Sequence, residues 1–245
     1  HFWLPSKKLN QNHKAYHEVI YVTCGVFEET QLMKLYAISG LGADHRVFDY
    51  LSLNLELEVL PWLDPESSES LESYVRRMAL KIDTSEPFGL IGVSFGGIVV
   101  VELNKIINPE FSILISSVVS KDEVPTLYRL VGKIGLLKWL PLFLFNPPRV
   151  LAHWLFGSKN KALLTAILDD TDLRFAKWAT QRIATWNSTT ETSNLIRVHG
   201  TSDRILPLPK HASALKIDNG THFMIVDRAN EVSTLINRNT PQQRI

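Results

Sequence analysis

The chain contains only one cysteine, and its charges almost cancel. Cys24 cannot form a disulfide within one chain, which agrees with a reducing, cytoplasmic setting and disfavours a cysteine-based metal site. The net charge of +1 predicts no strong attraction to nucleic acid. His13, His17, His153 and His211 lack the spacing of metal ligands. We therefore expect no metal, no cofactor and no nucleic-acid partner.

Long hydrophobic runs are also missing. The N-terminal residues contain no continuous apolar segment followed by a small-residue cleavage site, so no signal peptide is predicted. In the aromatic-rich region from 121 to 187, Lys138, Arg149 and three prolines leave no run near the ~18 residues of a membrane helix. We expect no integral membrane association, although an apolar face could rest on a lipid surface.

The length of 245 residues, 45% of them hydrophobic, fits one domain with a sizeable core. Residues 1–32 differ from the rest, because they contain no glycine before Gly25 and no clear period. Met33 directly precedes the first convincing strand. We predict an N-terminal extension over 1–32 and the functional domain over 33–245. The alternative is a genuine hairpin, since Val19–Thr23 has the composition of a strand.

The pentapeptide Gly92-Val93-Ser94-Phe95-Gly96 stands between two apolar runs. A serine with glycine two residues away on each side is typical of a nucleophile elbow, a sharp turn from strand to helix that exposes the hydroxyl. Side chains at the glycine positions would collide with the facing strand and helix. A hairpin turn that merely contains serine is the alternative, so residues elsewhere must decide.

An acid and a histidine follow near the C-terminus. Asp203 ends the sequence His199-Gly200-Thr201-Ser202-Asp203, directly after the strand-like residues 195–198. His222 follows a shorter strand-like run and precedes a helical stretch. Functional groups gather at strand carboxyl ends in open α/β sheets, and serine, acid and histidine in this order form a known type of triad. Asp122 is the alternative acid, and His199 is interpreted as a structural hydrogen-bonding residue.

With these motifs the chain resembles the α/β-hydrolase family from Met33 to the C-terminal helix. The resemblance implies Ser94 as nucleophile, Asp203 as acid and His222 as base. It also implies an oxyanion hole made by the backbone N–H groups of Phe95 and Leu41. The loop before Leu41 reads Ser-Gly, where family members commonly have His-Gly.

The alternation of strand and helix predicts an α/β fold, the α/β-hydrolase fold, with a mostly parallel, doubly wound sheet. Strands are expected at 34–38, 55–60, 111–115 and 195–198, and helices at 46–53 and 70–82. The β-branched run Ile98–Val101 has the composition of a strand, but we interpret it as part of a buried helix.

The alternation stops between about 121 and 187, where prolines separate several helical stretches. We predict a helical cap there, with Trp139 and Phe143 binding substrate. The alternative for such aromatic side chains is that they pack the core of the cap itself. His45 is a further candidate for the edge of the pocket.

Together these features predict a serine hydrolase acting on a small-molecule acyl substrate. It would cleave an ester or thioester of a small to medium, largely apolar acyl group through an acyl-serine intermediate. Two alternatives remain open: the same triad could perform carbon–carbon bond hydrolysis or cofactor-free peroxidase chemistry, or the protein could be a ligand-binding, receptor-like protein with little turnover.

Overall fold

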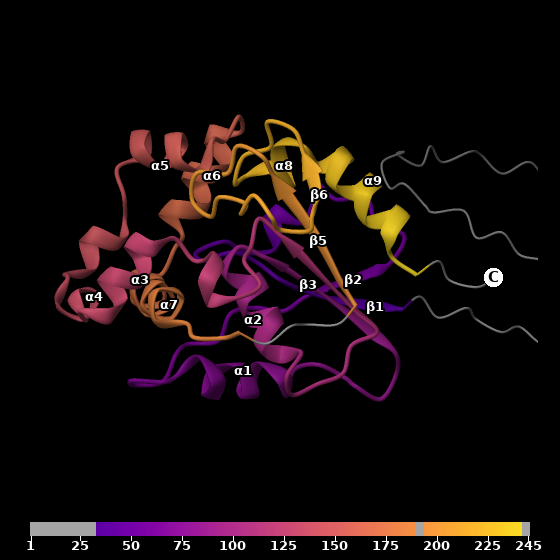
Figure 1. Ribbon diagram of the computed structural model, residues 1–245, viewed down its shortest axis with the longest axis horizontal. Helices are drawn as coiled ribbons and strands as arrows, with labels where there is room; N and C mark the ends of the chain where they lie inside the picture. Colours follow the sequence, from indigo (N-terminus) through magenta and orange to yellow (C-terminus); the bar gives the residue numbers. More distant parts are fainter. Residues whose placement is uncertain (1–32, 190–193, 242–245) are drawn as a thin grey trace, which may run out of the picture. The chain divides into compact units, whose positions relative to one another are not determined.

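The computed structural model describes residues 33–189 and 194–241 (Figure 1). The predicted extension 1–32, including Val19–Thr23 and Cys24, lies outside the described residues.

A six-stranded parallel sheet runs through the described part of the chain, in the order β2-β1-β3-β4-β5-β6. The strands are β1 (Lys34–Ile38), β2 (Glu56–Val59), β3 (Phe88–Val93), β4 (Phe111–Ile115), β5 (Leu195–Gly200) and β6 (Leu215–Ile217). The chain leaves β1 toward β2 on one side and then returns to β3 on the other side. In such sheets ligands bind at the carboxyl ends of the strands flanking this reversal. The fold class predicted from the sequence is confirmed.

Helices cover both faces of the sheet. Alternate residues of β1 point to opposite sides, so that Tyr36 packs with helices α1 (Leu71–Ala79) and α2 (Phe95–Leu103), whereas Leu35 packs with the opposite core. That opposite core includes η1 (His45–Val47), α8 (Met224–Asp227) and α9 (Ala229–Asn239). Every residue of α2 is buried, which explains how the run Ile98–Val101 remains helical against its strand propensity.

The expected helix over 70–82 is present as α1, and the side chain of Ser70 caps it by accepting a hydrogen bond from the N–H of Ser73. The expected helix over 46–53 is wrong, since only the short turn η1 forms there. The N–H groups of Ser52 and Asn54 instead donate to side chains of α9. These long-range hydrogen bonds replace the intrahelical ones that local sequence had suggested.

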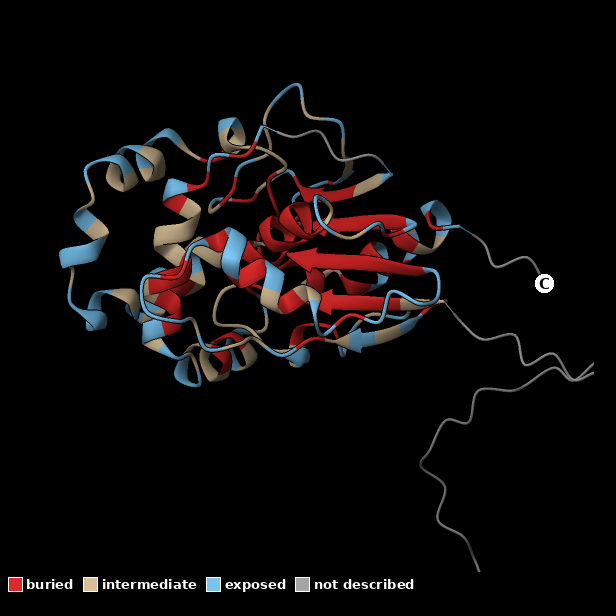
Figure 2. Cartoon of the chain, turned by 90° about the horizontal axis from the view of Figure 1, so that it is seen from below, coloured by how far each residue is buried: buried red, intermediate tan, exposed pale blue. Residues whose placement is uncertain are grey.

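Residues 121–187, here called the helical insertion, connect β4 to β5 without a strand. The insertion contains η2 (Lys121–Glu123), α3 (Thr126–Lys133), α4 (Leu136–Trp139), η3 (Leu142–Phe145), α5 (Arg149–Phe156), α6 (Lys161–Asp169) and α7 (Leu173–Thr185). Pro141 and Pro148 directly precede η3 and α5, as the breaks in the sequence predict. Figure 2 shows that the central strands of the sheet are largely buried and point toward a set of helices whose surface is largely exposed.

Candidate active site

Ser94 occupies the tight turn between β3 and α2. Its backbone has φ +53° and ψ −117°, in a region that L-residues rarely adopt. The N–H of Ser94 donates to the carbonyl of Ile115 at the end of β4 (2.9 Å). A strained residue persists only where its surroundings hold it, and such strain is typical of functional sites.

The two glycines of the pentapeptide are required by close backbone contacts. A Cβ on Gly92 would lie 2.5 Å from the carbonyl oxygen of Gly96 at the start of α2. A Cβ on Gly96 would lie 2.2 Å from the carbonyl oxygen of Ile38 at the end of β1. The collisions expected from the sequence, with the helix in one case and the neighbouring strand in the other, are therefore present.

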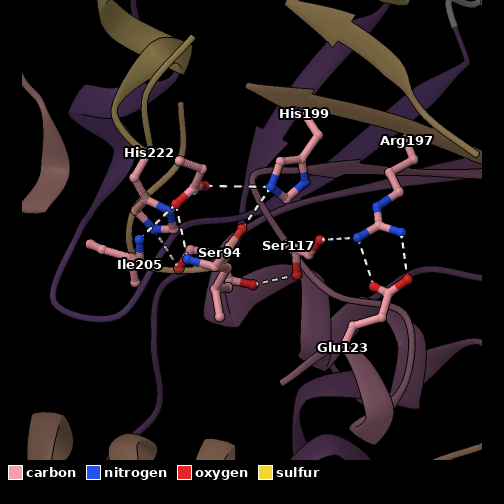
Figure 3. Close-up of polar contacts among 9 residues, drawn as sticks. Ser94, Ser117, Glu123, Arg197, His199, Ile205 and His222 are labelled. Carbon is pink, nitrogen blue, oxygen red and sulfur yellow. Dashed lines mark hydrogen bonds and ion pairs between the residues drawn. The ribbon is translucent and has the colours of Figure 1, made fainter. Parts of the chain in front are cut away.

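Ser94, His222 and Asp203 form a continuous hydrogen-bonded chain (Figure 3). The Oγ of Ser94 lies 2.9 Å from Nε2 of His222, and Nδ1 of His222 lies 2.8 Å from Oδ2 of Asp203. Asp203 follows β5, and His222 lies between β6 and α8. The structure thus brings together three side chains that are far apart in sequence.

The surroundings of Asp203 keep its carboxylate ionised. Its side chain is fully buried, which by itself would raise its pKa. The adjacent imidazole of His222 and the N–H of Leu206 outweigh this effect and lower the pKa of Asp203 below its ordinary value. Oδ1 accepts the N–H groups of Ile205 and Leu206, both at 2.9 Å. Asp203 is therefore suited to orient a histidine ring and to stabilise its positive charge.

His199 contacts the same acid from the other side. Its Nε2 lies 2.8 Å from the carbonyl oxygen of Leu206 and 3.5 Å from Oδ2 of Asp203. Because a carbonyl only accepts, Nε2 carries the proton. Complete burial lowers the pKa of His199, although the nearby Asp203 works in the opposite direction. A neutral ring that fixes the loop after β5 agrees with the structural interpretation of His199.

The predicted oxyanion donors belong to two segments that flank Ser94. A Cβ on Gly40 would lie only 3.5 Å from Cβ of Ser94, so the loop after β1 passes directly beside the serine. The N–H of Ala43 and the Nε1 of Trp62 both donate to the carbonyl of Gly40, which fixes this loop. Leu41 follows in the same loop, and Phe95 is the first residue of α2, where backbone N–H groups lack intrahelical acceptors.

A second polar network holds the backbone of the turn at Ser94 through its carbonyl oxygen (Figure 3). The Oγ of Ser117 donates to the carbonyl of Ser94 (2.7 Å), and the carbonyl of Ser117 accepts Nη2 of Arg197 (2.9 Å). Arg197 also donates to both carboxylate oxygens of Glu123, at 2.8 and 2.7 Å. Sequence reasoning missed this network, although an arginine inside the apolar strand 195–198 was a signal for it.

A cavity of about 490 Å³ adjoins Ser94, His222, Gly40 and Leu41. Its volume lies within the range of small-molecule sites. The insertion supplies much of the wall, which is almost entirely apolar: Leu127, Tyr128, Val131, Leu137, Leu155, Phe156, Leu164, Ile167, Leu168, Thr180, Ile183 and Ala184. The ring of Phe156 packs edge-on against the ring of His222, with 5.5 Å between their centres.

Trp139 and Phe143, predicted to bind substrate, do not line this cavity. Their exposed fractions are 87% and 68%, because α4 and η3 direct these rings outward. Aliphatic side chains of α3, α6 and α7 surround the cavity instead. The structure therefore gives these two rings no place in the wall of the cavity beside Ser94. Three other aromatic side chains of the insertion are buried in the core: Phe175, Trp178 and Trp186.

The remaining candidates lie away from Ser94. His45 is exposed and is not among the residues lining the cavity. Asp122, the alternative acid, is exposed and faces Arg129 at 3.6 Å. Within residues 33–189 and 194–241, no three His, Cys, Asp or Glu side chains are grouped so that they could hold a metal ion.

Comparison with solved structures identifies the fold. The chain is similar to a lipase-esterase related protein from Clostridium acetobutylicum (TM-score 0.62, 14% identity, covering 84% of this chain and 94% of that one). It is also similar to the enol-lactonase from Burkholderia xenovorans (TM-score 0.64, 14% identity, covering 86% of this chain and 92% of that one). A third similar structure is a bromoperoxidase from Bacillus anthracis (TM-score 0.59, 12% identity, covering 85% of this chain and 91% of that one).

The described part of the chain has the α/β-hydrolase fold. No family sequence model matches the chain, and no curated protein matches it in sequence. The identities to the solved structures are low, so the likeness concerns the fold, and the activity must be argued from the site.

Proposed function

We propose that the protein is a serine hydrolase that cleaves an ester or thioester of a small to medium, largely apolar acyl group. The observation that carries this proposal is the placement of His222 between Ser94 and a buried, ionised Asp203, at 2.9 and 2.8 Å. A serine hydroxyl is a weak nucleophile until a positioned base removes its proton, and this arrangement provides that base.

In the first half-reaction, Nε2 of His222 takes the proton of Ser94 Oγ as the oxygen attacks the carbonyl carbon. The carbonyl π electrons move to the carbonyl oxygen, which becomes an oxyanion. When that intermediate collapses, the bond to the leaving group breaks, and the departing alkoxide or thiolate takes the proton from His222. The product is an acyl ester of Ser94.

In the second half-reaction, His222 removes a proton from water, whose oxygen attacks the acyl-serine carbonyl. Collapse releases the carboxylic acid and returns the proton to Ser94. We assign the backbone N–H groups of Leu41 and Phe95 as the oxyanion hole in both halves. One such donor is typically worth about 3–4 kcal/mol of transition-state stabilisation.

The preference for an apolar acyl group follows from the cavity beside Ser94. In this proposal the helical insertion serves as the cap of the functional domain, and its aliphatic side chains contact the acyl chain. Removal of apolar surface from water contributes about 25 cal/mol per Å² before the costs of association. Sites lined by apolar side chains bind their ligands through buried apolar area and complementary shape, with few polar contacts.

Hydrolysis of p-nitrophenyl esters of increasing acyl length tests the proposal. We expect turnover by the full chain and its loss in Ser94→Ala. Ser67→Ala, which changes an exposed serine away from the cavity, is the matched control and should retain activity. Binding of esters without turnover would contradict the proposal and favour a receptor-like protein.

A further inference from the structure

The helical insertion exposes an unusual amount of large apolar side chain. Six representative residues define what we call the apolar insertion surface: Leu130, Ile134, Trp139, Phe143, Val150 and Trp154. Elsewhere in the described residues, large exposed apolar side chains are limited to Tyr50, Leu80 and Ile106. Large apolar side chains that gather on the exposed side of one segment can mark an interaction site.

The part of the insertion that carries this surface is basic. Residues 124–168 contain six lysines and arginines and no aspartate or glutamate, although the whole chain has a net charge of only +1. Lys133 and Lys138, on α3 and α4, are exposed beside the apolar side chains. A partner for this surface must therefore accept apolar side chains and carry negative charge.

The apolar insertion surface continues into the cavity. Helices α3 to α5 form the end of the described domain beyond the strand carboxyl ends (Figure 1). Leu127, at the start of α3, is both largely exposed and part of the cavity wall that also contains Ser94. Leu137 of α4 and Leu155 of α5 line the same cavity. An apolar path thus connects the exposed surface to Ser94.

We propose that the apolar insertion surface docks on an anionic phospholipid bilayer. Apolar side chains would enter the boundary between headgroups and acyl chains, while lysines extend to the phosphates. Among the described helices, none is both long and apolar enough to cross a membrane, so the contact is at the interface. A second copy fits less well, because a symmetric dimer would bring two basic segments together.

Docking on a bilayer would favour lipid-soluble esters as substrates. This inference about the substrate rests on the proposed function. A lipid-soluble ester could pass from the bilayer along Leu127 to Ser94 without first dissolving in water. The docking itself does not depend on turnover. Experiments with Ser94→Ala therefore separate the two proposals.

The test is cosedimentation of the full-length Ser94→Ala chain with vesicles of phosphatidylcholine, with or without phosphatidylglycerol. We expect binding to the anionic vesicles. It should fall by about tenfold or more in Lys133→Glu/Lys138→Glu, since each lysine near an anionic surface contributes substantially. A similar loss is expected in Trp139→Ser/Phe143→Ser, because apolar area no longer enters the lipid.

Matched controls change exposed residues outside the insertion. Leu80→Ser removes a side chain that is as exposed as Val150, and Lys81→Glu/Lys216→Glu reverses two exposed lysines. Both should bind like the parent chain, and a blue shift of tryptophan fluorescence should accompany binding. Circular dichroism confirms that each variant is folded.

Three outcomes would overturn the docking proposal. One is equal sedimentation with neutral and anionic vesicles, and another is equal loss in the control variants. The third is absence of vesicle binding together with a dimer, or a complex with an acidic polypeptide, that Trp139→Ser/Phe143→Ser abolishes. Absence of esterase activity in the parent chain, with vesicle binding retained, would overturn only the proposed function.

Discussion

Arg197 on β5 forms a buried, two-pronged ion pair with Glu123 at the start of the helical insertion. The same guanidinium donates to the carbonyl of Ser117, whose hydroxyl holds the carbonyl of Ser94. One cation thus links the base of the insertion to the strained turn that carries the serine. Removing either charge would leave the other buried without its countercharge.

Arg197→Met should destabilise the fold by about 3–5 kcal/mol, as expected when one partner of a buried pair is lost. The double variant Arg197→Met/Glu123→Leu should lose less than the sum of the two single variants. Urea unfolding in a double-mutant cycle measures this coupling. Arg228→Met, which breaks an exposed pair with Glu231, is the control and should change stability far less. Strict additivity would contradict the account.

Ser117→Ala should lower kcat by roughly 3- to 10-fold with little change in KM, because a hydrogen bond of about 0.5–1.5 kcal/mol no longer holds the carbonyl of Ser94. Steady-state ester hydrolysis measures the split. Ser112→Ala removes an equally buried hydroxyl, which is bonded to Asn104 away from the elbow. The Ser112→Ala variant should be less stable than the parent chain but have the same kcat. Equal losses of kcat in Ser117→Ala and Ser112→Ala would argue against a positioning role for Ser117.

His199 should make the fold sensitive to mild acid. Its pKa is lowered from the ordinary 6.5, so the unfolded chain binds a proton that the folded chain does not. The free energy of unfolding should therefore decrease as the pH falls below about 6.5. His199→Gln should flatten this slope, whereas the exposed His211→Gln should leave it unchanged. Thermal unfolding from pH 7.5 to 5 measures it, and parallel slopes in all three proteins would refute the assignment.

The cavity should set the preferred acyl length. In the parent chain, kcat/KM should rise with each methylene, by up to about 0.8 kcal/mol, until the cavity is full. Val131→Phe or Ile183→Phe should shorten the preferred chain because both residues line the cavity. Trp139→Ala, in a residue that does not line it, should leave the profile for soluble esters unchanged. A flat profile, or a shift caused by Trp139→Ala, would rule out this cavity as the acyl site.

The sequence was most informative where a short motif imposes its own backbone geometry. The glycines beside Ser94 are required by contacts at 2.5 and 2.2 Å, and that requirement is visible as a local pattern. The approach of Asp203 and His222 follows from the parallel α/β architecture, which the alternation of elements predicts, because strand carboxyl ends meet at one edge of the sheet.

The direction of side chains in the insertion was not predictable in this way. Trp139 and Phe143 sit in elements of four residues with apolar side chains on several faces, so no period indicates which face is buried. The pair of Arg197 and Glu123 joins residues 74 positions apart, and no local pattern specifies such a partner. The shortening of the expected helix at 46–53 likewise depends on hydrogen bonds that the N–H groups of Ser52 and Asn54 donate to distant side chains of α9.

The most direct test of the account is labelling with a fluorophosphonate followed by intact-mass and peptide analysis. We expect one adduct, located on Ser94, that is absent in Ser94→Ala. Labelling should be greatly slowed in His222→Gln, which cannot take the serine proton. Ser67→Ala, an exposed control, should label like the parent chain. A folded parent chain that remains unlabelled, or an adduct that persists in Ser94→Ala, would contradict the assignment of Ser94 as the nucleophile.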